Sequence, residues 1–129
     1  RVILLAGECA RRQLGFEPYL RAHALGRDLA DAYDQALNDV DVLAMPTVPS
    51  VAASLPEQDA STGERWAAAV ATTGNTAAFN LTGHPAITVN CGFLDGLPVG
   101  LMFIARKGDE ASLFRAASAV ESVTEDRRP

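Results

Sequence analysis

The sequence predicts an α/β fold in which helices pack on a mixed β-sheet. Long segments with apolar residues three and four positions apart indicate helices, and short apolar runs bounded by proline or glycine indicate strands. The chain has 129 residues, of which 48% are hydrophobic, so it suits one domain with a real core. Three expected strands make a thin sheet, and we therefore expect the chain to be a piece of a larger fold.

Two helices open the chain. A helix is expected over 2–14, and Gly15 is a natural stop at its C-terminal end. The residues that share one side of it are Val2, Leu5, Ala6, Cys9, Ala10 and Gln13. The next helix is expected to begin around Phe16, with Pro18 in its first turn, and to run to about Leu37. Its apolar residues keep a spacing of three and four, while charged residues take the opposite, solvated side.

The middle of the chain combines a strand, a loop and a weak helix. Residues 40–45 are almost wholly apolar and are followed by proline, which is typical of a strand buried inside a larger sheet. Residues 50–62 are polar and contain proline, which predicts a loop. The pattern of 63–82 is helical but rich in poor helix formers near its centre, and Gly83 ends it.

A hairpin and a helix complete the fold. The predicted strands 86–91 and 99–105 flank the turn signal Asp95-Gly96, which favours an antiparallel pair. The last helix is expected over 109–123, because its apolar residues form one stripe and its first residues are acidic. We expect the tail, 124–129, to fray.

Composition excludes several classes of partner. The chain has 11 Lys and Arg residues against 16 Asp and Glu, a net charge of −5, whereas nucleic acid and anionic membranes need a basic face. No apolar run approaches the ~20 residues of a membrane helix, and the opening segment is too short for a signal peptide. Cys9 and Cys91 have no metal or redox spacing, which indicates a reduced, cytoplasmic protein. Because Arg1 is not Met, we expect further chain before it.

Most residues with catalytic potential have a simpler structural interpretation. We expect His23 on a helix surface, and His84, between glycine and proline, in a structural role. The aspartates at 28, 31 and 34 favour a solvated helix face over a metal site. Cys91 lacks an evident base and is expected to be buried and inert, and Lys107 is expected in solvent.

Residues 73–86 are the most informative segment. Gly83 and Pro85 bracket a sharp change from helix to strand. Small or short polar residues leave one side of the preceding helix poorly filled, and they include Thr73, Gly74 and Ala77. Such a face can line a cavity, or it can allow close packing of helix on sheet, and the residue types favour neither interpretation.

Four motifs, in their order and spacing, resemble the C-terminal part of the amidase signature family. They are Tyr33 with Asp41-Val42-Leu43 and Pro46-Thr47-Val48-Pro49, then 75–86 (NTAAFNLTGHPA), 96–102 (GLPVGLM) and Asp109-Glu110-Ala111. Together they cover roughly residues 16–122. The helix at 2–14 and the residues of 95–102 are similar to those of amidases acting on simple organic amides.

The resemblance implies hydrolysis of a carboxylic amide to an acid and ammonia. The family uses a serine nucleophile, a bridging serine in a cis peptide and a lysine base, while backbone amides hold the oxyanion. No metal or other cofactor is implied. The sequence contains no Gly-Gly-Ser-Ser-Gly-like stretch, and Lys107 lies in none of the family's lysine motifs. We therefore assign no catalytic residue and expect the catalytic core to lie upstream.

The resemblance does imply residues that bind substrate. In the family, one side of the helix before the Asn-Leu-Thr-Gly-like turn faces the acyl part of the substrate. The matching positions are Val70, Thr73 and Ala77, whose i, i+3, i+7 spacing puts them on one helix face. In the glutamine-dependent transamidation subunits, the place of Thr73 is taken by an acid that binds the substrate amino group. Threonine has no charge, so we expect a neutral, apolar or aromatic acyl group.

We expect residues 1–129 to be the C-terminal segment of a single amidase domain, inactive alone, that contributes sheet strands and one wall of the acyl pocket. Its expected partners are a small-molecule amide and the upstream catalytic part of the same polypeptide, with no nucleic acid and no membrane. A homodimer of the full-length enzyme stays open. The alternative is a non-catalytic remnant that acts as a binding or scaffold domain. A third interpretation is an unrelated small α/β regulatory domain.

Overall fold

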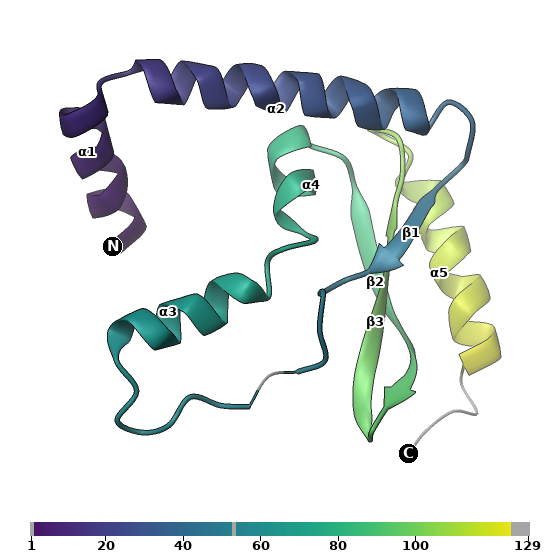
Figure 1. The fold of residues 1–129 in the computed structure, drawn as a ribbon. Coiled ribbons are helices and arrows are strands. Elements are labelled where there is room, and N and C mark those ends of the chain that lie inside the picture. The colour runs from purple at the N-terminus through teal and green to yellow at the C-terminus, as the bar shows by residue number, and fades with distance from the viewer. Residues whose placement is uncertain (1, 53, 125–129) are drawn as a thin grey trace.

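A computed structural model describes residues 2–52 and 54–124 of the chain (Figure 1). Its elements are α1 (Val2–Leu14), α2 (Glu17–Ala36), β1 (Leu43–Pro46), α3 (Thr62–Ala71), α4 (Ala77–Thr82), β2 (Ala86–Leu94), β3 (Leu97–Ile104) and α5 (Glu110–Thr124). The predicted α/β fold, with helices packed on a sheet, is confirmed. The tail expected to fray lies outside the described residues, except for Thr124, which ends α5.

The described strands form one three-stranded sheet in the order β1-β3-β2, with both pairs antiparallel. The predicted hairpin is confirmed, and its strands extend to the turn itself. Asp95 and Gly96 have φ angles of 53° and 78°, the left-handed conformation that a tight hairpin turn requires. A bulge between Asn90 and Gly92 shifts the register once along the hairpin.

β1 differs from its prediction. It covers 43–46 rather than 40–45, and it lies at an edge of the sheet of this chain rather than inside it. Leu43 and Met45 are half-buried, while Ala44 and Pro46 are exposed. This alternation is typical of a strand that is covered on one face. Because β3 pairs with only one side of β1, the other side is left as an edge able to receive a strand.

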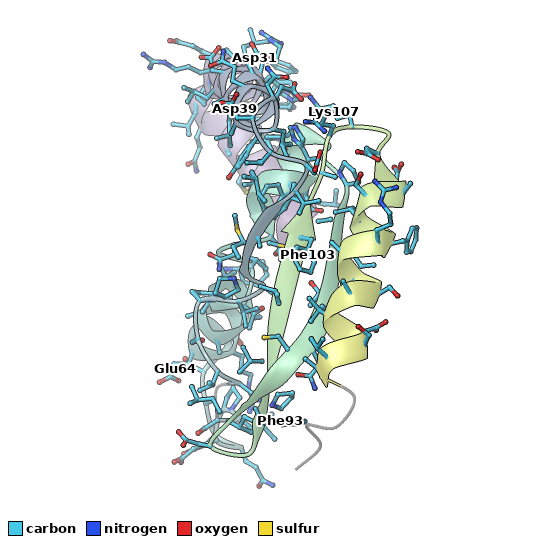
Figure 2. The ribbon with its side chains drawn as sticks, turned by 90° about the vertical axis from the view of Figure 1, so that its right-hand side faces the viewer. Asp31, Asp39, Glu64, Phe93, Phe103 and Lys107 are labelled. Atoms are coloured by element: carbon cyan, nitrogen blue, oxygen red, sulfur yellow. The ribbon has the colours of Figure 1, made fainter. Side chains whose placement is uncertain are left out.

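The core is divided between the two faces of the sheet. On one face, α5 packs along the hairpin (Figure 2), and the buried residues are Val89, Phe103, Ala105, Leu113 and Ala117. Met102 and Ile104, which alternate with Phe103 and so face the other way, pack with Phe79 of α4. The Tyr33 ring of α2 lies 5.0 Å from the Phe79 ring and closes this second cluster.

α2 connects the sheet region to an outlying helix. Figure 1 shows α1 hanging from the end of α2 that is remote from the sheet. Gly15, with φ of 72°, ends α1 as predicted, and its N–H bonds to the carbonyl of Arg11 at 3.0 Å. Apolar side chains around this bend are exposed, including Leu14, Phe16 and Tyr19. No helix within 2–52 and 54–124 has the length and apolar character of a membrane span.

The helix expected over 63–82 is interrupted. α3 begins at a capping box in which Ser61 and Glu64 satisfy each other's backbone N–H, and it ends at Ala71. Turns occupy 72–76 before α4 begins, and Gly83 ends α4 with φ of 75°. The interruption falls on the poor helix formers that the sequence concentrates there.

Candidate functional site

The three predicted pocket residues are distributed over this interruption and the two helices that flank it. Val70 is in the last turn of α3, Thr73 is in the turn, and Ala77 begins α4. The prediction that they share one face of a continuous helix is therefore wrong, because turns at 72–76 separate α3 from α4. The hydroxyls of Thr72 and Thr73 donate to the carbonyls of Ala69 and Val70, each at 2.8 Å, so their bonds stay within the segment.

Backbone bonds nevertheless keep these residues together. The N–H of Thr73 bonds to the carbonyl of Val70, and the N–H of Ala77 bonds to the carbonyl of Thr73, both at 3.0 Å. All three are exposed, and 46% of Val70 is accessible. The result is an open surface of one branched apolar chain, one methyl group and one hydroxyl. These three side chains carry no ionisable group, so they can bind and orient a neutral group but cannot transfer a proton.

This surface is attached to the end of β1. The side-chain Nδ2 of Asn75 donates to the carbonyl of Pro46 at 2.8 Å. The next N–H along, that of Thr47, bonds to the carbonyl of Gly100 in β3 at 2.9 Å. Gly74 lies so near Pro49 that a β-carbon on it would be 3.5 Å from the proline Cγ. Sequence reasoning missed this attachment, since a bond between residues 29 positions apart leaves no local pattern.

His84 has the structural role that the sequence predicted. It is buried, with its Nδ1 2.9 Å from the Thr82 hydroxyl and its Nε2 3.1 Å from Asp34 Oδ1. A neutral ring protonated at Nε2 donates to the carboxylate and accepts from the hydroxyl, so both nitrogens are satisfied. His84 thereby joins the end of α4 to α2.

Asp34 departs from the solvated role predicted for the aspartates of α2. Its second oxygen accepts a bond from Lys107 Nζ at 3.0 Å. This lysine is exposed as expected, but it is held at the end of the molecule that also carries Asp31 (Figure 2). The Lys107 ammonium, and after it His84, hold the pKa of the Asp34 carboxyl below its ordinary value. The pair therefore links α2 to the loop after β3.

The other candidates form no reactive group. His23 lies against Tyr19, with ring centroids 4.4 Å apart. Cys91 is half-buried rather than fully buried, and its thiol donates to the carbonyl of Val99 at 3.4 Å. Cys9 is also a free thiol, and it is exposed. Across 2–52 and 54–124, no three His, Cys, Asp or Glu side chains gather into a metal-binding cluster.

The family follows from comparison with known proteins. The family model described as Amidase matches residues 3–114. The chain belongs to the amidase signature family. A solved relative with the same fold is a glutamyl-tRNA(Gln) amidotransferase component from Thermotoga maritima, with a TM-score of 0.72 and 27% identity. That match covers 95% of this amidase-family chain and 26% of the Thermotoga chain.

Two sequence relatives extend the comparison. An uncharacterized protein in the nthA 5' region of Rhodococcus erythropolis is 37% identical over 123 residues, covering 95% of this chain and 62% of the relative. An enantioselective amidase from Rhodococcus rhodochrous is 40% identical over 103 residues, covering 79% of this chain and 20% of the relative. This amidase-family chain thus spans 62% of one relative's length and 20% of the other's.

Proposed function

We propose that the chain is the C-terminal segment of a single amidase domain, and that the full-length enzyme hydrolyses a carboxylic amide to an acid and ammonia. The observation that carries the proposal is the 40% identity to an enantioselective amidase over 103 residues. The fold shared with the Thermotoga protein supports the assignment as a segment of a longer chain, because 95% of this chain aligns to 26% of that protein.

In this proposal the catalytic residues lie outside residues 1–129. The serine nucleophile belongs to an upstream Gly/Ser-rich segment, and no such stretch occurs in this sequence. This chain supplies sheet strands and one wall of the acyl pocket. The exposure of Val70, Thr73 and Ala77 supports that role, since a wall residue must not be covered by its own segment. The free thiols of Cys9 and Cys91 support a reducing compartment such as the cytoplasm.

Amide hydrolysis by the full-length polypeptide tests this function. We expect ammonia release from a neutral amide such as benzamide, and no release from residues 1–129 alone. The fragment incubated with an excess of the same amide is the matched control, because it contains every residue described here but no upstream segment. Turnover by the fragment would show that its own side chains perform the reaction, and would overturn the assignment.

Substrate preference tests the wall. Thr73→Asp adds a carboxylate, so we expect the full-length enzyme to lose preference for neutral amides and gain preference for amides carrying an amino group. Thr72→Asp is the matched control, because Thr72 is an exposed neighbour whose hydroxyl makes the same kind of bond to a backbone carbonyl. An unchanged preference in Thr73→Asp, with activity retained, removes Thr73 from the pocket.

A second candidate function is a non-catalytic remnant that acts as a binding or scaffold domain. The Rhodococcus erythropolis relative favours it, since 123 matched residues make up 62% of that protein, which is much shorter than a relative covered to 20%. Such a remnant must be self-sufficient. Cooperative unfolding of residues 1–129 as a monomer supports the remnant, and association or poor cooperativity supports the segment of an enzyme.

A further inference from the structure

The proposed pocket wall includes a turn whose own hydrogen bonds are local. Residues 72–76 form turns rather than a helix, and Thr72, Thr73 and Gly74 are exposed. Local hydroxyl bonds such as that of Thr73 to Val70 join residues within the segment but do not tie it to the rest of the fold. A surface that discriminates between acyl groups needs a fixed position relative to the sheet, because misplacement by about 1 Å is enough to weaken binding and catalysis.

Asn75 provides the connection to the sheet. Its Nδ2 bonds to the carbonyl of Pro46 at 2.8 Å. Pro46 is paired with Leu101 in the sheet, and the following Thr47 bonds through its N–H to Gly100 at 2.9 Å. The acceptor carbonyl therefore belongs to a peptide group whose N–H is bonded to β3, and Asn75 connects the turn to that peptide group.

Gly74 lies beside Pro49, next in sequence to Asn75. A β-carbon at Gly74 would lie 3.5 Å from Pro49 Cγ, so the glycine backbone runs close beside the proline ring. Proline has a fixed φ angle, which makes the segment after β1 a stiff support. The turn therefore lies alongside residues 46–49, and the Asn75 hydrogen bond is the interaction that joins them.

We propose that Asn75 is a positioning residue for acyl recognition: its bond to the Pro46 carbonyl sets the place of Val70, Thr73 and Ala77 in the pocket. The proposal rests on the proposed amidase function and deepens it. Asn75 donates to backbone and does not touch substrate, so it acts through the wall. It matters most for acyl groups large enough to reach the wall.

The test uses the full-length enzyme with Asn75→Asp, which has the same shape but cannot donate to a carbonyl. We expect KM for benzamide to rise by up to about fivefold, since the effect on binding cannot exceed the free energy of one neutral hydrogen bond, with kcat little changed. KM for acetamide, whose acyl group is too small to use the wall, stays as in the parent. A merely structural defect instead lowers kcat for both amides together, and that result overturns the proposal.

A second measurement separates this proposal from the function on which it rests. Hydrogen exchange at the amides of Thr73 and Ala77 reports the order of the turn directly, without any substrate. We expect faster exchange in Asn75→Asp and no change in Asn38→Asp, an exposed asparagine in the turn after α2. Unchanged exchange in Asn75→Asp overturns the proposal that the Asn75 bond positions the turn, even if the enzyme is active. Faster exchange in a protein that hydrolyses no amide supports the positioning role of the Asn75 bond and rejects the proposed amidase function instead.

Discussion

Gly100 of β3 lies against two threonine side chains. A β-carbon there would lie 2.8 Å from Thr47 Oγ1 and 3.0 Å from Thr88 Cγ2. The hydroxyls of these two threonines are bonded to each other at 3.1 Å across the β3 backbone. The space above Gly100 is therefore already occupied, and glycine is the residue that leaves room for the pair.

Gly100→Ala should destabilise the protein by about 1–3 kcal/mol, the usual cost of forcing an extra methyl group into a filled site. Urea unfolding measures it. Adding Thr47→Ala removes the nearest obstructing atom, so the double variant should recover part of the loss relative to the sum of the single variants. Strict additivity of the two changes would show that the predicted clash does not exist.

Asp34 gives the fold a contribution that depends on pH. Its pKa is lowered by Lys107 first and His84 second, so the folded state favours the charged carboxylate. A lowered pKa means stability that is fully present above the ordinary value of 3.8 and is lost as pH falls through the lower, folded value. Acidification below about pH 4 should thus weaken the link between α2 and the loop after β3.

Asp34→Asn should remove this contribution. We expect the variant to be less stable than the parent at neutral pH and to approach it as pH falls below about 4, where the parent's carboxylate becomes protonated. Thermal unfolding at a series of pH values measures both. Asp31→Asn, on the same helix and exposed, is the matched control and should leave the acid profile unchanged. A constant difference between Asp34→Asn and the parent at every pH contradicts the assignment.

At the scale of elements, helices and strands set by interactions between residues near in sequence could be predicted, and contacts between distant residues could not. α1, α2, α5 and the hairpin could be read from the sequence because their signals are local: periodic apolar residues, Gly15 and Asp95-Gly96. The interruption at 72–76 was visible as weak helix propensity, but its consequence for the three wall residues was not. The bond that orients the turn joins Asn75 to Pro46, and such a pairing is decided by the tertiary fold.

The strand after α2 shows the same limit. Residues 40–45 are apolar enough for an interior strand, yet in this chain the strand that forms lies at an edge and covers 43–46. A side chain's burial depends on what pairs with the free edge, and the proposed upstream segment is the natural occupant. The sequence therefore predicted that a strand forms here. Its position at the edge of the sheet depends on which segments pair with it, and the local sequence does not determine that.

Leu113 tests how much of the stability comes from α5. It is 3% exposed and packs in the cluster that includes Phe103, so Leu113→Ala should cost about 2–5 kcal/mol through lost burial and a cavity. The measurement is the urea midpoint. Ser118→Ala, an exposed position on the same helix, should change stability by no more than about 0.5 kcal/mol. Equal effects of the two variants would mean that α5 is not packed on the hairpin as described.

At the scale of the whole molecule, the bend between α1 and α2 carries an apolar surface that the proposed function does not use. A groove of about 520 Å³ there is lined mainly by apolar or small residues, including Ala10, Leu14, Phe16, Pro18 and Tyr19. The side chains of Leu14 and Phe16 are 64% and 59% exposed. Contiguous apolar surface of this kind marks an interaction site in a stable protein and an aggregation risk in an incomplete one.

The groove leads to a prediction about the isolated chain. Residues 1–129 produced alone should associate as their concentration rises, because the apolar side chains of the bend are exposed in this chain. Sedimentation velocity over a range of concentrations measures this. Leu14→Ser with Phe16→Ser should weaken the association, since both changes remove apolar area from the groove.

Leu55→Ser is the matched control for this last experiment. Leu55 is 92% exposed, but it lies in the loop before α3 rather than on the bend, so its loss should leave association unchanged. Association that survives the paired Leu14 and Phe16 changes would assign the contact to another surface, with the open edge of β1 as the next candidate. A chain that stays monomeric at every concentration and unfolds cooperatively would instead favour the self-sufficient remnant over the segment of a larger enzyme.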